Sequence, residues 1–111
     1  MSVDEATAER IRTALAPVAG RVREQRMFGG IGWMVEGNMA VGTWDGSGLL
    51  VRVGKDGMEA ALAEEHVGRM QMGERTMNGF VVIDPAGIAT DATLQAWVDR
   101  GVAVALALPP K

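Results

Sequence analysis

The residues of this chain that could do acid–base or nucleophilic chemistry are few. His66 is the single histidine, cysteine is absent, and Ser47 stands between two glycines. A general base needs a nucleophile or a substrate proton within reach, and neither residue has an evident partner motif. We therefore interpret His66 as the end of a helix, where an imidazolium suits the helix dipole. Ser47 is interpreted as a turn residue.

A glycine cluster, Gly29-Gly30-Ile31-Gly32, could suggest a phosphate-binding loop. A dinucleotide fingerprint starting at Gly30 requires its third glycine where this chain has Val35. No Gly-Lys-Ser/Thr follows, and the next segment has the pattern of a strand, not of a helix. We interpret the cluster as a bend or bulge in a sheet.

Metal and cofactor sites are not indicated by residue spacing. One histidine, no cysteine and scattered carboxylates match neither zinc-site nor EF-hand spacing. The sequence therefore predicts no catalytic residue, no metal ligand and no cofactor, and we expect a protein that is not an enzyme.

The first quarter of the chain concentrates arginines among acidic residues. The net charge is −3, which is unusual for a protein that grips phosphate backbones unaided. We expect a mixed solvated surface there, and direct nucleic-acid binding is not expected. The residues concerned are Arg10, Arg12, Arg21, Arg23 and Arg26, balanced by Asp4, Glu5, Glu9 and Glu24.

Length and composition predict a single soluble domain over residues 1–111. Hydrophobic residues make up 48% and charged residues 23% of the chain. The absence of cysteine fits the cytoplasm. The acidic N-terminus does not have the sequence pattern of a signal peptide. The longest apolar run, residues 102–108, is far shorter than the roughly 20 residues that a membrane span needs.

The elements that must position any site follow from periodicity. Ser2 starts a capping box for a helix that ends near Ala16. Strands are predicted over 21–28, over both arms of a hairpin within 31–44, over 49–53 and over 79–83, with a helix from Asp56. Residues 67–78 are expected to be irregular. Thr90 or Asp91 caps a last helix that Pro109-Pro110 stops. The order α-β-β-β-β-α-β-α predicts an α+β two-layer sandwich: an antiparallel sheet of about five strands, with helices mainly on one face.

The hairpin within 31–44 predicts an exposed apolar surface. Gly37-Asn38 suits a type II′ turn, which places Trp33 opposite Gly42 on one face. The second face then carries the pair of Met34 and Val41 together with Met39. Since one face meets the helices, the other needs a cover: a loop, a ligand, a partner or a second copy of the chain. Methionines there, and in the loop with Met70 and Met72, suit an adaptable groove or an ordinary core.

Three stretches then resemble the N-terminal domain of the TfoX/Sxy competence-regulator family. They are Met27-Phe28-Gly29-Gly30, Gly37-Asn38-Met39-Ala40 and Leu50-Val51-Arg52-Val53. The similarity continues through Gly73-Glu74-Arg75-Thr76-Met77-Asn78-Gly79-Phe80-Val81 and Leu94-Gln95-Ala96-Trp97-Val98. It covers nearly the whole chain in the right order and implies a stand-alone domain of this type.

The resemblance implies a two-layer α/β fold and a role in switching on DNA-uptake genes through a transcription factor. It carries over no catalytic residue. We expect a non-enzymatic interaction module, a transcription or competence co-regulator that binds a protein partner or forms a homodimer. The alternative is a small-ligand-binding protein or small enzyme with a pocket near Arg52 and the methionine loop. The candidate surface consists of Met27, Phe28, Met34, Met39, Val41, Arg52, Met70 and Met72.

Overall fold

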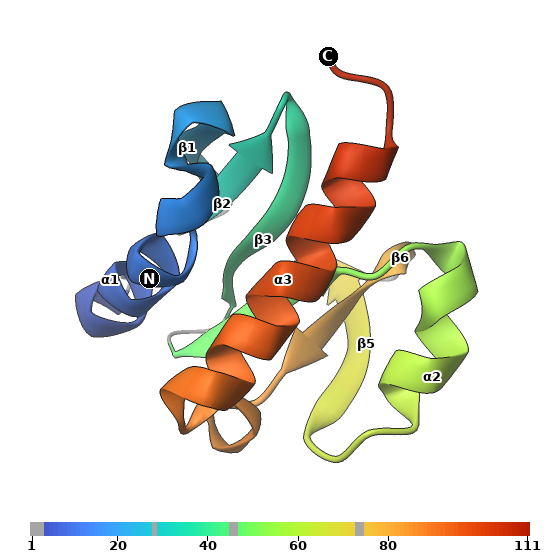
Figure 1. Cartoon of the computed structure of the whole chain (residues 1–111). Helices are drawn as coiled ribbons and strands as arrows, with labels where there is room; N and C mark the ends of the chain where they lie inside the picture. Colours follow the sequence, from blue (N-terminus) through green and yellow to red (C-terminus); the bar gives the residue numbers. More distant parts are fainter. Residues whose placement is uncertain (1–3, 28, 45–46, 73–74) are drawn as a thin grey trace.

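The protein forms two layers, with helices in front of a sheet (Figure 1). The computed structural model describes residues 4–27, 29–44, 47–72 and 75–111. Along the chain the elements are α1 (Glu5–Ala14), η1 (Ala16–Arg21), β1 (Val22–Met27), β2 (Gly30–Val35), β3 (Asn38–Trp44), β4 (Gly48–Arg52), η2 (Lys55–Gly57), α2 (Met58–Leu62), β5 (Val67–Met72), β6 (Arg75–Ile83), η3 (Pro85–Ile88) and α3 (Asp91–Ala107).

Six antiparallel strands form one sheet in the order β1-β2-β3-β4-β6-β5. The predicted α+β architecture is confirmed, with one strand more than expected. The additional strand is β5, in a segment for which the sequence predicted no regular structure. It pairs with β6, where Arg69 lies opposite Val81, but the register shifts between Arg69 and Gln71. This irregular pairing interrupts the alternation by which strands are recognised in a sequence.

Both long helices begin at a side-chain cap. Asp4 precedes α1, and its Oδ1 accepts hydrogen bonds from two first-turn N–H groups at 3.0 and 3.3 Å. Thr90 caps α3 in a reciprocal arrangement with Thr93, which confirms the predicted start of that helix. The predicted cap at Ser2 falls outside the described residues.

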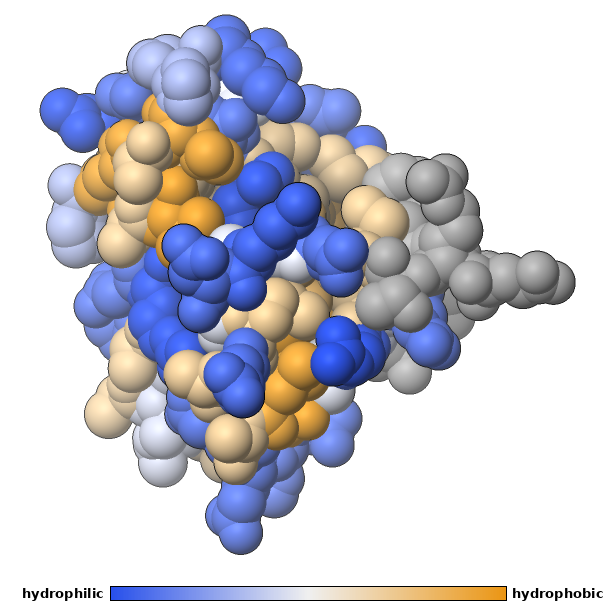
Figure 2. Space-filling model, turned by 90° about the vertical axis from the view of Figure 1, so that its right-hand side faces the viewer, coloured by the Kyte–Doolittle hydropathy of each residue, from blue (hydrophilic) through white to orange (hydrophobic). Residues whose placement is uncertain are grey.

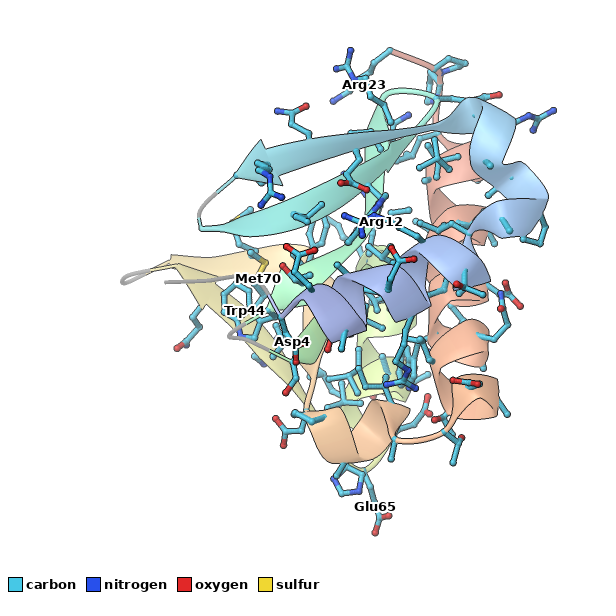
Figure 3. All side chains as sticks on the ribbon, turned by 90° about the vertical axis from the view of Figure 1, so that its left-hand side faces the viewer. Asp4, Arg12, Arg23, Trp44, Glu65 and Met70 are labelled. Atoms are coloured by element: carbon cyan, nitrogen blue, oxygen red, sulfur yellow. The ribbon has the colours of Figure 1, made fainter. Side chains whose placement is uncertain are left out.

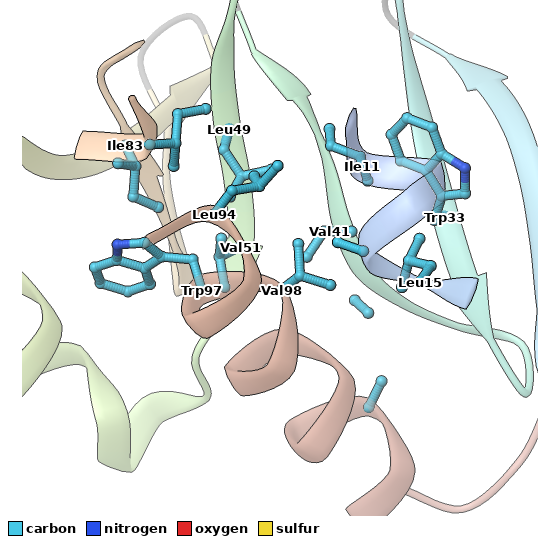
Figure 4. Close-up of a cluster of buried hydrophobic side chains, with 14 of the residues drawn as sticks. Ile11, Leu15, Trp33, Val41, Leu49, Val51, Ile83, Leu94, Trp97 and Val98 are labelled. Atoms are coloured by element: carbon cyan, nitrogen blue, oxygen red, sulfur yellow. The ribbon is translucent and has the colours of Figure 1, made fainter. Parts of the chain in front are cut away.

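The core lies between the helices and the sheet, with α3 running across β3 and β4 (Figure 4). Gly101 allows α3 to approach β3 closely. A Cβ atom at this position would lie 2.5 Å from the carbonyl oxygen of Ala40 and 2.9 Å from Cγ1 of Val41. The largest fully buried side chains are Trp33, Ile11, Ile31, Leu49, Ile83 and Ile88, followed by five valines.

The turn between β2 and β3 consists of Glu36 and Gly37, not of Gly37 and Asn38 as predicted. Both turn residues have positive φ, 51° and 88°, which is the conformation of a type I′ turn. Val35 therefore lies opposite Asn38, and the predicted type II′ register is wrong. Asn38 begins β3, where its Nδ2 donates to the carbonyl oxygen of Pro109 at 2.9 Å. The sequence could not reveal this partner 71 positions away.

The changed turn also changes the partner of Trp33. Trp33 lies opposite Val41, and Gly42 lies opposite Gly32, so the predicted Trp33–Gly42 pair is wrong. The expectation that the indole is buried is confirmed, because Trp33 is only 1% exposed. It lies on the side of the sheet that faces α1 (Figure 4).

A bulge in β3 separates the two faces of the hairpin. Met34 pairs with Met39, whereas Trp33 pairs with Val41, so Ala40 is the extra residue. Ala40 and Val41 are consecutive, yet both are completely buried in the core cluster. The bulge thus directs two neighbouring residues toward the helices. It leaves Met34 and Met39 on the opposite side.

The chain after α3 returns to the β2–β3 turn. The backbone N–H of Lys111 donates to the carbonyl oxygen of Glu36 at 2.9 Å, next to the Asn38–Pro109 bond. A Cβ atom on Gly37 would lie 2.6 Å from the Lys111 carbonyl oxygen. The glycine thus provides both the positive φ of the turn and the space for the tail.

Candidate interaction surface

The face of the sheet opposite α1, α2 and α3 carries no helix among the described residues (Figure 1). Side chains of directly paired residues point to the same side, so the register assigns residues to this face. Glu24 reaches α1, which places Arg23 and Gln25 on the other side. Leu49 and Val51 lie in the core, so the residues that alternate with them point away from it. We call the following set the open face: Arg23, Gln25, Met27, Met34, Met39, Leu50, Arg52, Phe80 and Val82.

Two methionines of the open face lie over a pair of glycines. A Cβ atom on Gly32 would come within 3.1 Å of Cε of Met39 and 3.3 Å of Cε of Met27. A Cβ atom on the facing Gly42 would lie 2.8 Å from the same Met39 methyl group. Both methionines are half-buried. Because thioether side chains adopt many rotamers, this part of the open face can adjust to the shape of a partner.

Arg52 connects three strands of the open face. From β4 its Nε donates to the carbonyl oxygen of Met39 on β3 at 2.6 Å. Its guanidinium lies over the ring of Phe80 on β6, with Cζ 4.6 Å from the ring centroid. Burial lowers the pKa of the Arg52 guanidinium. Among the described residues no carboxylate forms an ion pair with it.

The structure gathers four of the eight candidate residues on the open face: Met27, Met34, Met39 and Arg52. The assignment of Val41 to this surface is corrected, because the bulge turns it into the core. Met70 of β5 (Figure 3) is 5% exposed and lies outside the main core cluster. Phe28 and the side chain of Met72 lie outside the described part of the chain.

Sequence reasoning missed several members of the open face. Phe80 lies opposite Arg52, and Val82 lies opposite Leu50. The alternation in residues 80–83 could have placed Phe80 and Val82 on this side, since Val81 and Ile83 belong to the core. Arg23 carried no such signal, because β1 is polar on both sides.

A charged cluster lies on the helix side of the sheet. Arg12 lies between α1 and the strands (Figure 3) and binds Glu24 in bidentate fashion, at 2.8 and 2.9 Å. Trp33 donates from Nε1 to Glu24 at 3.0 Å. The hydrogen bonds from Arg12, and then the one from Trp33, hold the pKa of the Glu24 carboxyl below its usual value, against the effect of burial. The cluster borders a pocket of about 180 Å³ that is also lined by Leu15, Ala19 and Val22.

The N-terminal arginines do not form one basic patch. Arg12 binds Glu24, Arg21 lies 3.5 Å from Glu36, and Arg26 lies 3.9 Å from Glu5. Arg10 contacts the loop before α3. There it donates to the carbonyl oxygen of Ile88 at 2.7 Å and lies 3.5 Å from Asp91. The described residues therefore form a surface of interleaved positive and negative charges, as expected.

His66 does not end a helix, so that interpretation is wrong. Helix α2 ends at Leu62, and His66 lies in the turn before β5 with a positive φ of 69°. Its carbonyl oxygen accepts the N–H of Asp84 at 2.9 Å. Ser47 lies in the turn before β4, as expected. Within the described ranges no group of three or more His, Cys, Asp or Glu residues could hold a metal ion.

A second apolar area lies over the C-terminal half of α3 (Figure 2). Val104 and Leu106 of α3 and Leu108, which follows it, are partly exposed. Hydrophilic residues interrupt the surface between this area and the rest of the view. The open face differs from this area because it combines apolar side chains with arginines.

The fold and this surface define a small α+β domain with one helix layer and one open, arginine-bearing sheet face. The chain belongs to the family of the TfoX N-terminal domain, whose model matches residues 13–105. The predicted resemblance is therefore confirmed. Comparisons with curated proteins and with solved structures give no significant match. Of the helices in the described ranges, none has the length and apolar character needed to cross a bilayer.

Proposed function

We propose that this protein is a non-enzymatic interaction module that binds a protein partner through the open face. The observation that carries the proposal is a sheet face on which the described residues place no helix and on which Met34, Met39 and Phe80 are partly exposed. Sheet faces are normally covered when their side chains are largely apolar. A partner protein would supply that cover.

The alternative, a small-ligand-binding protein or enzyme with a pocket near Arg52, has less support. A pocket lined by described residues lies on the helix side, next to Arg12 and Glu24. Its volume of about 180 Å³ is below the roughly 300 Å³ at which ligand pockets begin. Its two charged groups bind each other, which leaves them poorly placed to act on a substrate.

Family membership suggests the kind of partner. We propose that the module acts in the cytoplasm as a co-regulator of transcription, including that of competence genes, by contacting a transcription factor. The charge pattern supports contact with protein rather than with DNA, because most N-terminal arginines are engaged with carboxylates of the same chain.

The experiment is affinity capture of the tagged protein from its native cell, followed by mass spectrometry and by direct binding to the purified partner. Met34→Asp places a charge on the open face. Ala96→Asp is the matched control, because Ala96 is exposed on α3 in the helix layer. We expect the partner to be retained by the control and lost with Met34→Asp. A capture pattern that is the same for both variants would show that the open face does not bind it.

A further inference from the structure

The charges of this protein are divided between the two sides of the sheet. The chain carries a net charge of −3, yet among the described residues the open face has two arginines and no carboxylate. The described carboxylates lie on or next to helices, in turns, or, for Glu24, on the helix-facing side of β1. The open face therefore carries positive charge in its described part, although the chain as a whole is acidic.

The two arginines lie at separate positions in one row across the sheet. Arg23 on β1 pairs with Met34 on β2, which pairs with Met39 on β3. The Met39 carbonyl oxygen binds Arg52 on β4. Neighbouring strands are spaced by about 4.8 Å, so the Cα atoms of the two arginines are roughly 14 Å apart. Across the sheet, the apolar side chains of Met34 and Met39 therefore lie between the basic side chains of Arg23 and Arg52.

The guanidinium of Arg52 is positioned but only partly satisfied. Its Nε donates a hydrogen bond to the Met39 carbonyl oxygen, and one side of the guanidinium plane lies over the ring of Phe80. No described side chain accepts a hydrogen bond from its Nη atoms. A half-buried guanidinium fixed in this way can form a strong, charge-assisted bond to an incoming carboxylate at low entropic cost.

We propose that the open face binds a protein segment in which two acidic residues flank apolar side chains. Arg23 and Arg52 take the two carboxylates, and the methionines between them pack against the apolar residues. This inference rests on the proposed function and specifies the chemistry of the partner. A span of about 14 Å between the two Cα atoms corresponds to about nine residues of a helix or four residues of a strand, and the long arginine side chains widen the range of carboxylate spacings that they can reach.

Two other occupants fit the row less well. A second copy of the chain would bring two further arginines to the interface. The described residues of its open face would add no carboxylate to pair with them, so the like charges would repel. Single-stranded nucleic acid fits less well because the chain carries a net charge of −3, and one face of the Phe80 ring is already covered by Arg52.

The test selects random 16-residue peptides, displayed on phage, for binding to the purified full chain. Individual selected peptides are then measured by fluorescence anisotropy against Arg23→Gln, Arg52→Gln and Met34→Asp. Arg69→Gln is the control, since Arg69 is exposed and lies opposite the core residue Val81. Thermal unfolding identifies any variant that is not folded. Arg23 is exposed, so Arg23→Gln keeps the test informative if Arg52→Gln does not fold.

The expected result is a pool enriched in Asp and Glu together with apolar residues. Arg23→Gln and Arg52→Gln should each weaken binding at least about tenfold, as expected for a charge-assisted bond, and Arg69→Gln should leave it unchanged. Selected peptides that depend on Met34 but show no acidic enrichment would overturn this inference and leave the proposed function standing. Peptides whose affinity is the same for the wild type and for all open-face variants would contradict both this inference and the proposed function.

Two further measurements decide between the occupants. Sedimentation velocity should show a monomer, and a dimer that Met34→Asp dissociates would identify the occupant as a second copy. A fluorescent single-stranded 20-mer DNA should bind more weakly than the peptides. Tighter DNA binding that is lost in Arg52→Gln would overturn the assignment to an acidic protein segment.

Discussion

Replacing Gly101 by alanine sets helix propensity against packing, and the structure indicates which effect is larger. Alanine in the middle of a helix is favoured over glycine by about 1 kcal/mol. However, the added methyl group would lie 2.5 Å from the Ala40 carbonyl oxygen and 2.9 Å from Val41 Cγ1. Relief of the shorter contact, from 2.5 Å to the 3.4 Å of ordinary van der Waals contact, requires α3 and β3 to move apart by about 0.9 Å at this point.

The expected net effect of Gly101→Ala is a loss of stability. Overpacking a well-packed core costs about 1–3 kcal/mol. We expect the upper end, because the atom met first belongs to the backbone and cannot change rotamer. After the gain in helix propensity, the free energy of unfolding should fall by about 2 kcal/mol. This is a large fraction of the stability of a small domain.

Urea unfolding followed by far-UV circular dichroism measures this change. With a slope of about 2 kcal/mol per molar urea, the midpoint should decrease by about 1 M. Gly20→Ala is the matched control, since Gly20 is exposed and a Cβ atom there would have no heavy atom within 4 Å. The control should be neutral or stabilised by less than about 1 kcal/mol. A Gly101→Ala protein as stable as the wild type would refute the close packing of α3 on β3.

Two further predictions concern the cluster beneath α1. Trp33→Ala should cost about 3–5 kcal/mol in a urea titration, because the indole is 1% exposed, and a loss below about 1 kcal/mol would contradict its burial. The pKa of Glu24 is lowered in the folded state, chiefly by its hydrogen bonds from Arg12. The ionised carboxylate therefore stabilises the fold above the unfolded pKa of about 4.3, and this stabilisation is lost as the pH falls through the folded pKa. Glu24→Gln should therefore be less stable than the wild type at pH 7, and the two unfolding midpoints should approach each other as the pH is lowered below the unfolded pKa. A difference that does not shrink on acidification would show that the ion pair is not its source.

The elements of this fold that could be predicted from the sequence are those with local signals. The cap at Thr90, the strand β4 and the stop at Pro109-Pro110 all depend on signals within a few residues, and the structure confirms them. The β2–β3 register could not be obtained in this way. In the observed register Asn38 contacts the distant Pro109, a partner that a reading of local turn propensity does not include.

The same distinction explains the outcome for the candidate surface. Arg52 was predicted on the candidate surface, and it lies on the side opposite the core because β4 contains no bulge. Val41 was misplaced because the extra residue Ala40 shifts the alternation by one position. A strand that is one residue out of register exchanges its two faces, so a single bulge is enough to move a core residue to a predicted surface.

The contact between the tail and the β2–β3 turn also has a consequence for folding during synthesis. The turn at Glu36 and Gly37 leaves the ribosome long before Pro109 and Lys111 are made. Until then the side chain of Asn38, which is 2% exposed in the finished fold, has no carbonyl partner and must bind water instead. The hairpin can form early, but residues 109–111 can close its turn only after they too have been synthesised. The last step in the assembly of the β2–β3 turn therefore comes about 70 residues after the turn itself is made.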